Sequence, residues 1–194
     1  MRIRVKAAGV SPTDAKIRGG YVQAVFRLPP DAVLGFEAAG VVDAIGPSVS
    51  GVNVGDNVAS LLAGLGGYAE YVLASSWTPK PANVSWSDAA ALPVAAEAAV
   101  GILKQLRVMR GETLLVLGAA GSVGMIATQL AASWGVTVIG AAAPRDQDLV
   151  RSLGALPVTY GGGLADRGAR SDARAHTGAR ARAGSRGHSG FRPG

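Results

Sequence analysis

The central part of the chain alternates short apolar runs with an amphipathic segment. Leu114–Leu117 is an apolar run of the length typical of a buried parallel strand. A glycine-rich stretch, 118–124, follows, and apolar residues then recur at helical spacing from Val123 to Trp134. A second apolar run, Val136–Gly140, comes after Gly135. This order predicts a strand–turn–helix–strand unit within a parallel sheet.

The first part of the chain has the alternating period of half-buried strands. Charged and apolar residues alternate over Arg2–Ala8. Further strands are predicted at Val33–Val42, Asn57–Leu62 and Tyr68–Leu73, separated by glycine turns. Short strands with frequent glycine turns predict a small antiparallel barrel or sandwich.

Capping residues and glycines predict the remaining elements. Ser11 to Asp14 and Ser85 to Asp88 have the pattern of helix starts, and a longer helix is predicted from Pro93 to about Leu106. A helix over Asp146–Leu153 and a strand over Leu156–Tyr160 complete the predicted elements.

The glycine-rich stretch has the chemistry of an anion site. Backbone N–H groups at the start of a helix have no internal acceptor and lie at the positive end of the helix dipole. Gly121 would let a pyrophosphate approach, and Gly124 would let the helix pack on the strand, although Ala119 replaces the first glycine of G-x-G-x-x-G. The predicted cofactor contacts here are Ala120, Gly121, Ser122, Val123 and Gly124. The alternative is a tight turn that binds no ligand.

Charge and composition narrow the classes of function. No charged residue lies between Glu112 and Arg145, but Gly, Ser, Thr and Gln interrupt this stretch, which favours a buried sheet over a membrane span. The chain has no cysteine, which excludes disulfides, thiolate metal ligands and a cysteine nucleophile. With no secretory leader pattern, we expect a cytoplasmic protein without a membrane partner.

The basic charge lies mainly in the last part of the chain. Residues 161–194 hold a net charge of +5 of the total of +6, with seven arginines and nine glycines. We therefore predict no nucleic-acid partner for the folded part, and a disordered tail over 161–194. An Arg/Gly-rich RNA-binding tail is one alternative, and we favour translation of GC-rich DNA in a wrong reading frame.

Several stretches resemble one known family. They are Val5–Tyr21, Leu34–Val49, Gly66–Val72, Ala89–Ala99, the glycine-rich turn and Val150–Ala155. In this order they resemble the medium-chain dehydrogenase/reductase superfamily, in its zinc-independent NADPH:quinone oxidoreductase-like branch.

The resemblance implies an α/β plus β fold. A partial GroES-like substrate domain is expected over 1–92, and a partial Rossmann domain, a doubly wound parallel sheet that binds NADPH, over 93–160. The implied activity is hydride transfer from NADPH to a small-molecule quinone or an activated C=C bond (an enone). Zinc-binding relatives have a cysteine where Ser11 stands and a histidine where Phe36 stands, so no metal site is expected.

The second predicted strand favours NADPH over NADH. NAD-binding folds place an acidic residue after this strand, but this chain has none before Asp146. Arg145 could instead pair with a 2′-phosphate, and its alternative role is that of a solvated loop arginine. Ala143, where relatives often have a serine, is the other predicted contact here.

The resemblance also implies residues near the substrate. Ser11 and Asp14 match the segment that lines the nicotinamide site in relatives, and Tyr21 lies near a substrate tyrosine of some relatives. Each also has a structural alternative, since Ser11 and Asp14 cap a helix and Tyr21 follows the Gly19-Gly20 turn as a packing residue.

Only three of the strands of a full Rossmann sheet are recognisable, and the family likeness stops at Tyr160. We therefore expect a chain truncated at both ends, for which the family's homodimer is doubtful. An inactive fragment and a non-catalytic interaction module are the alternatives to an active reductase.

Overall fold

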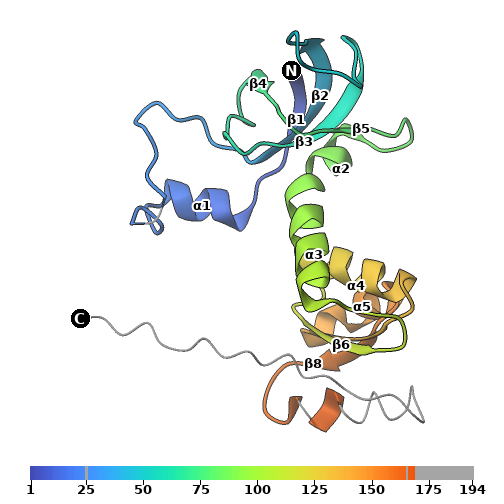
Figure 1. Cartoon of the computed structure of the whole chain (residues 1–194). Helices are drawn as coiled ribbons and strands as arrows, with labels where there is room; N and C mark the ends of the chain where they lie inside the picture. The colour runs from blue at the N-terminus through green and yellow to red at the C-terminus, as the bar shows by residue number, and fades with distance from the viewer. Residues whose placement is uncertain (25, 165, 169–194) are drawn as a thin grey trace. The chain divides into compact units, whose positions relative to one another are not determined.

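The computed structural model describes residues 1–24, 26–164 and 166–168. The chain divides into two compact units, Met1–Ala95 and Ala96–Gly194 (Figure 1). Most of the predicted tail, residues 165 and 169–194, lies outside the described residues, so the expectation of disorder there stays a prediction.

The first unit is built on one five-stranded antiparallel sheet with the order β4-β1-β2-β3-β5. The strands are β1 (Arg2–Ala8), β2 (Glu37–Ala44), β3 (Asn57–Leu61), β4 (Tyr71–Leu73) and β5 (Thr78–Pro79). Ile3, Val42, Val58 and Leu62 are fully buried and form its core. The sheet is tightly packed where a Cβ on Gly40 would overlap the carbonyl oxygen of Arg4.

Strand β2 is shorter than predicted. The strand expected from Val33 begins at Glu37, because Gly35 has a positive φ of 104° that interrupts the extended backbone. Residues before β2 instead bind a second glycine turn, with the Gly67 and Tyr68 N–H groups donating to Gly35 and Leu34 at 3.1 and 3.0 Å. For the same reason the strand expected from Tyr68 begins at Tyr71.

Two helices belong to the first unit, and a third begins in it. They are α1 (Pro12–Arg18), α2 (Trp86–Ala90) and α3 (Pro93–Leu106). Ser11 and Ser85 are the N-caps of α1 and α2, as predicted. Helix α3 has the predicted bounds, and it begins in the first unit and ends in the second.

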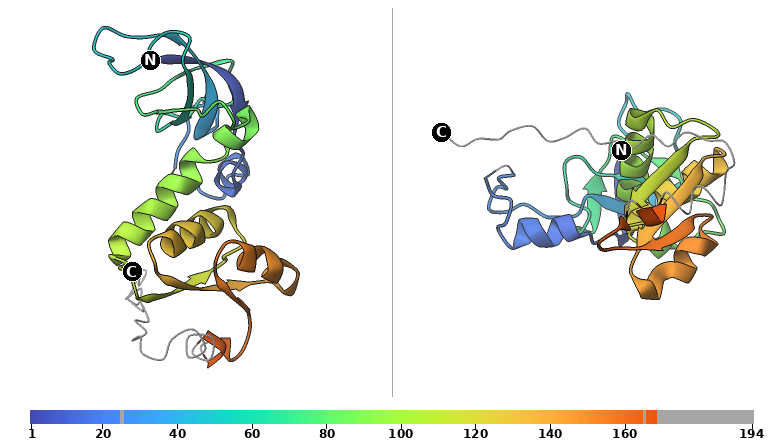
Figure 2. Two further views of the ribbon diagram at one scale, coloured as in Figure 1. Left: turned by 90° about the vertical axis from the view of Figure 1, so that its right-hand side faces the viewer. Right: turned by 90° about the horizontal axis from the view of Figure 1, so that it is seen from below.

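The second unit is a three-stranded parallel sheet with the order β6-β7-β8. Its elements are β6 (Thr113–Leu117), α4 (Ser122–Ser133), β7 (Thr137–Ala142), the 3₁₀ turn η1 (Pro144–Asp146), α5 (Gln147–Ser152) and β8 (Leu156–Thr159). Helices α4 and α5 lie side by side on one face of the sheet (Figure 2). This is the arrangement of one half of a doubly wound fold, in which β6 is strand one.

Apolar residues cover both faces of this sheet. On one face, Leu103 of α3, Ala131 of α4 and Val150 of α5 form a buried cluster with Val138 of β7. The buried residues Ile139, Ala141 and Val158 of the sheet form a separate cluster on the other face. The stretch without charged residues, predicted to be a buried sheet, is therefore β6, α4 and β7. None of the helices in the described part of the chain is both long and apolar enough to cross a bilayer.

The structure describes residues beyond Tyr160, where the predicted folded part of the chain ends. Residues 161–164 and 166–168, expected to belong to a disordered tail, form a turn and a short helical segment. Leu164 packs on the second face of the sheet, and the Arg167 guanidinium donates to the carbonyl oxygens of Thr159 and Gly162 at 2.9 and 2.6 Å. These contacts hold the segment against the rest of the second unit, although its composition predicts disorder.

Candidate functional site

The turn after β6 requires glycine at two positions. Gly118 has a positive φ of 81°, and its N–H and that of Ala119 both donate to the Ala141 carbonyl oxygen at 3.1 Å. A Cβ on Gly124 would overlap the Gly118 carbonyl oxygen. The absence of that side chain lets α4 start directly against the end of β6, as the sequence predicts.

The start of α4 presents backbone donors without a capping side chain. Gly121 is the N-cap and has no side chain to accept from the first N–H groups of the helix. A Cβ on Gly121 would come within 3.3 Å of the Gly118 carbonyl oxygen, so a larger side chain would project over the turn. Ser122, Val123 and Gly124 form the first turn of α4, and Ala120 lies just before it, so the five predicted contacts are contiguous around the helix start.

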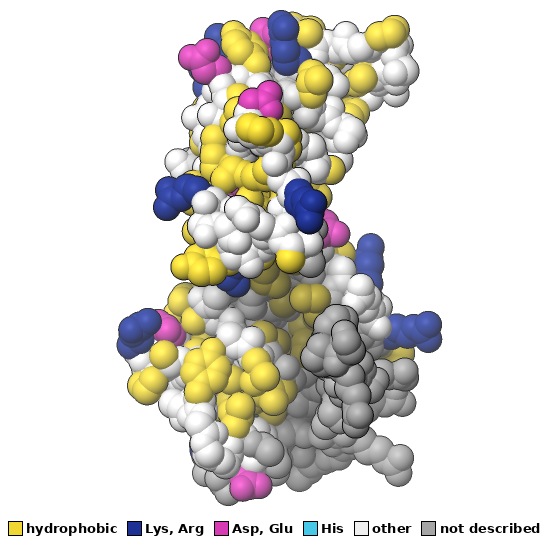
Figure 3. Space-filling model, turned by 90° about the vertical axis from the view of Figure 1, so that its left-hand side faces the viewer, with side chains coloured by type: hydrophobic (Ala, Val, Ile, Leu, Met, Phe, Trp, Pro, Cys, Tyr) yellow, Lys and Arg dark blue, Asp and Glu magenta, His cyan; other side chains and the backbone are white. Residues whose placement is uncertain are grey.

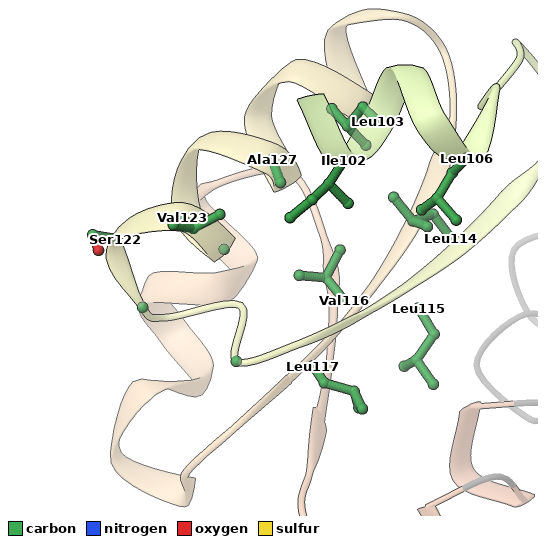
Figure 4. A pocket seen from close by; sticks show the side chains of 13 residues that line it. Ile102, Leu103, Leu106, Leu114, Leu115, Val116, Leu117, Ser122, Val123 and Ala127 are labelled. Carbon is green, nitrogen blue, oxygen red and sulfur yellow. The ribbon is translucent and has the colours of Figure 1, made fainter. Parts of the chain in front are cut away.

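An apolar pocket of about 430 Å³ reaches this turn. Ile102 and Leu106 of α3 extend toward Leu114 and Val116 of β6 (Figure 4). Ala127 of α4 lies beside Ile102, and Val123 lies at the end of the pocket nearest the glycine turn. Strand β6 lies at the edge of the sheet, where the fourth strand of a full doubly wound fold would pair.

The loop after β7 carries the other two predicted cofactor contacts. Ala143 is half-buried at the end of β7, and its carbonyl oxygen accepts from the Asp146 N–H at 3.0 Å. The side chain of Arg145 is 87% exposed, with its Nε 3.7 Å from Asp146 Oδ2. Such an exposed ion pair is weak, so the guanidinium is available to an anionic ligand.

Tyr160 is a residue at this edge that sequence reasoning treated only as part of a strand. It directly follows β8, and its hydroxyl oxygen lies 3.8 Å from the position of a Cβ on Gly118. The phenol therefore stands beside the glycine turn, at the carboxyl ends of the parallel strands. The available sequence signal was its place as the last residue of the third predicted strand, Leu156–Tyr160.

Ser11 and Asp14 lie in the first unit and cap α1. The Ser11 N–H and hydroxyl donate to Asp14 Oδ2 at 2.9 and 2.7 Å, and the Asp14 N–H donates back to Ser11 Oγ at 3.4 Å. Asp14 is only 4% exposed. This geometry is a capping box, so both residues have the structural role given as their alternative. Their assignment to the nicotinamide site stays a prediction.

Tyr21 is highly exposed, and its ring contacts the glycine turn that precedes it. Its side chain is 84% exposed, and its ring lies against Gly19, where a Cβ would come within 2.7 Å of the ring. A packing role on the Gly19-Gly20 turn accounts for this position. A direct role with substrate stays a prediction.

Two further ionisable residues lie near Asp14. Glu37 is 6% exposed and accepts from the Val94 N–H at 2.8 Å, which places a carboxylate at the start of α3. Burial raises the pKa of Glu37, the nearby Asp14 charge adds to the rise, and the Val94 bond opposes it. Burial, then the Asp14 charge, also raises the pKa of the Tyr68 phenol. Sequence reasoning did not assign Tyr68 to a site.

The predicted residues therefore form two groups, each within one unit. Ser11 and Asp14 lie with Glu37 and Tyr68 in the first unit. The glycine turn, the β7–α5 loop and Tyr160 lie at the carboxyl ends of the strands of the second unit. Within each unit, the Lys and Arg side chains on the face shown in Figure 3 are scattered over the surface.

Comparison with known proteins supports both units. Residues 1–82 match the alcohol dehydrogenase GroES-like domain. Residues of the chain are 41% identical over 157 residues to the pikromycin polyketide synthase component PikAII of Streptomyces venezuelae, covering 79% of this chain and 4% of that protein. They are 36% identical to the quinone oxidoreductase of Sus scrofa, covering 79% of this chain and 47% of the relative. The chain thus spans about half the length of this relative.

Solved structures of similar proteins include a quinone oxidoreductase and an enoyl reductase. A quinone oxidoreductase of Pseudomonas syringae is 34% identical, with a TM-score of 0.75 over 86% of this chain and 52% of that chain. The CurK enoyl reductase is 30% identical, with a TM-score of 0.72 over 81% of this chain and 50% of that one.

A mycobacterial protein solved in complex with NADPH is also similar. It is 33% identical, with a TM-score of 0.72, and the match covers 84% of this chain and 51% of that chain. Taken with the GroES-like unit and the parallel sheet that begins with a glycine turn, these comparisons show that the chain is similar to the quinone oxidoreductase-like members of the medium-chain dehydrogenase/reductase superfamily.

Proposed function

We propose that this chain binds NADPH at the carboxyl edge of its parallel sheet and serves zinc-independent hydride transfer to a quinone or an activated C=C bond. The observation that carries the proposal is the pairing of two features at that edge. One is the glycine turn that opens α4, and the other is the loop that presents Arg145.

The turn fits a pyrophosphate. Backbone N–H groups at the start of α4 point out of the helix with no capping side chain, and Gly121 leaves the approach open. A complete doubly wound fold holds a dinucleotide between two halves. The described residues form the half with strands one to three, so we assign the adenosine and pyrophosphate to them.

The choice of NADPH rests on the loop after β7. An NAD-binding fold places an acid here for the ribose 2′-hydroxyl, but Ala141 and Ala142 end this strand and Ala143 follows it. Arg145 is exposed and could form a charge-assisted pair with a 2′-phosphate. Tyr160, beside Gly118, is a further hydrogen-bond donor within this edge.

The residues at the family's zinc positions do not fit that metal. Ser11 Oγ is engaged with Asp14, and the Phe36 ring packs at 6.0 Å from the Phe26 ring. No cluster of three His, Cys, Asp or Glu residues able to hold a metal occurs within the described ranges. These side chains support a reaction without a zinc ion.

When bound, NADPH would supply the hydride, and the protein would orient the cofactor. Tyr68 is protonated near neutral pH, as any phenol with an ordinary pKa of 10.0 is, and burial raises its pKa further. Asp14 fixes the backbone around Ser11. Quinone oxidoreductases and an enoyl reductase among the similar proteins support a quinone or a conjugated C=C bond as the acceptor.

The test is a titration of the full chain with NADPH, with NADH as the comparison. We expect the wild-type chain to bind NADPH more tightly than NADH. Gly121→Leu should abolish binding of both, because its side chain would occupy the pyrophosphate position. Arg145→Ala should weaken NADPH about tenfold and leave NADH nearly unchanged. Turnover is then measured with a quinone and with an enone.

A matched control is Gly101→Leu. Gly101 lies on α3 with open space around its Cβ position, so this variant should fold and bind as the wild type does. A folded wild-type chain that binds neither nucleotide would contradict the proposal. Binding without turnover would support the cofactor site and favour the non-catalytic alternative.

A further inference from the structure

The loop that carries Arg145 is held by one side chain. Gln147, the first residue of α5, directs its Nε2 at the carbonyl oxygens of Ala142, Ala143 and Val158, at 3.0, 3.2 and 3.2 Å. Two of these carbonyls belong to the end of β7 and its loop, and the third belongs to β8. A single amide therefore joins two strands to the start of the next helix.

These carbonyls need a side-chain donor because of where they lie. At the carboxyl end of a parallel strand the sheet ladder stops, and a buried carbonyl left without a donor is costly. All three contacts are acceptors, so only the NH₂ end of the amide can face them. With two hydrogens for three oxygens, one hydrogen is shared. Neither a carboxylate nor a thioether could replace this amide.

The same contacts close the loop around Arg145. The Ala143 carbonyl accepts from both the Gln147 side chain and the Asp146 N–H, so the loop from Ala143 to Gln147 is bound at its two ends. Pro144 further fixes the backbone between them. The Arg145 side chain itself remains exposed. The base of this arginine is thus fixed while its guanidinium is free to meet a ligand.

We propose that Gln147 is a positioning residue that selects NADPH over NADH by fixing the loop from which Arg145 reaches the 2′-phosphate. This rests on the proposed function. Gln147 acts through Arg145, because its own amide hydrogens are already committed to the three carbonyl oxygens.

The test is a double-mutant cycle on the affinities for both nucleotides. Gln147→Met keeps the length of the side chain and adds no charge, but removes the donor. We expect it to weaken NADPH about fivefold and to leave NADH within about twofold. Added to Arg145→Ala, it should cause no further loss, since the two residues act on one contact. Gln129→Met is the matched control, because Gln129 is exposed on α4 and donates to one carbonyl of its own helix.

The outcomes separate this proposal from the one on which it rests. If the wild-type chain prefers NADPH and Gln147→Met prefers it equally, the positioning role is wrong and the cofactor site stands. Equal losses for NADPH and NADH, or losses that multiply in the double variant, would also overturn it, since they indicate a general structural role or an independent contact. If the folded wild-type chain binds neither nucleotide, the proposed function fails and this proposal fails with it.

Discussion

The two units of this chain differ in which polar groups make up their candidate sites. The first unit buries carboxylates, with Asp14 and Glu37 at 4% and 6% exposure. Asp14 Oδ2 accepts from the Ser11 N–H and hydroxyl, and Glu37 Oε2 accepts from the Val94 N–H, while Asp14 Oδ1 is buried without a donor from the described residues. The second unit builds its candidate site from backbone N–H groups, glycines and exposed side chains, and the only buried polar side chain among its described residues is Thr128. A change of pH should therefore alter the stability of the first unit, whereas a larger side chain at the glycine turn should alter the stability of the second.

The largest effect is expected from volume at the glycine turn. Gly124→Val should lower the free energy of unfolding of the second unit by about 3 kcal/mol or more, because its Cβ would overlap backbone atoms of Gly118. Gly101→Val, at a helical position with open space, should change it by about 0.5 kcal/mol or less. Urea unfolding followed by circular dichroism compares the two. Equal stability of the two variants would show that the turn is not closely packed.

A smaller effect is expected from a buried carboxylate that caps a helix. Asp14→Ala removes both hydrogen bonds from Ser11 and should cost the first unit about 1–2 kcal/mol. The matched variant is Asp88→Ala, which removes an exposed partner of Ser85 at the start of α2 and should cost about 0.5 kcal/mol. The comparison is made by urea unfolding. A larger loss at Asp88 would contradict the importance of burial.

The smallest effect concerns pH. Because burial raises the folded-state pKa of Glu37, its ionised form disfavours folding, and this penalty is relieved as pH falls through the raised pKa toward 4.5. Glu37→Gln keeps an oxygen for the Val94 N–H but cannot ionise. We expect wild-type stability to rise relative to Glu37→Gln between pH 8 and about 4.5, measured by urea unfolding across this range. A constant difference would show that Glu37 does not carry this pH dependence.

Periodicity and capping residues were enough to predict local elements. Helix α3 and the β6–α4–β7 unit follow the sequence pattern because a buried strand and an amphipathic helix each leave a distinct spacing. The predicted start of β2 was wrong. Gly35 has a positive φ and accepts a backbone hydrogen bond from a turn more than thirty residues later, which no local pattern records.

Long-range contacts explain what the sequence did not show at the candidate site. Glu37 binds the N–H of Val94, 57 positions away, and no local pattern records such a pairing. Tyr160 comes beside Gly118 only when β8 joins the sheet. Gln147 is one polar residue among several in its segment until the carbonyls of two strands converge on it.

The uncharged composition of β6, α4 and β7 has a practical consequence for chemical mapping. Trypsin cleaves after lysine and arginine, and the chain has neither between Arg110 and Arg145. Complete digestion should therefore release residues 111–145 as one peptide that contains the whole glycine turn. A photoreactive nucleotide analogue attached anywhere in that turn would change the mass of this single fragment, so occupancy of the site can be read by mass spectrometry without measuring catalysis.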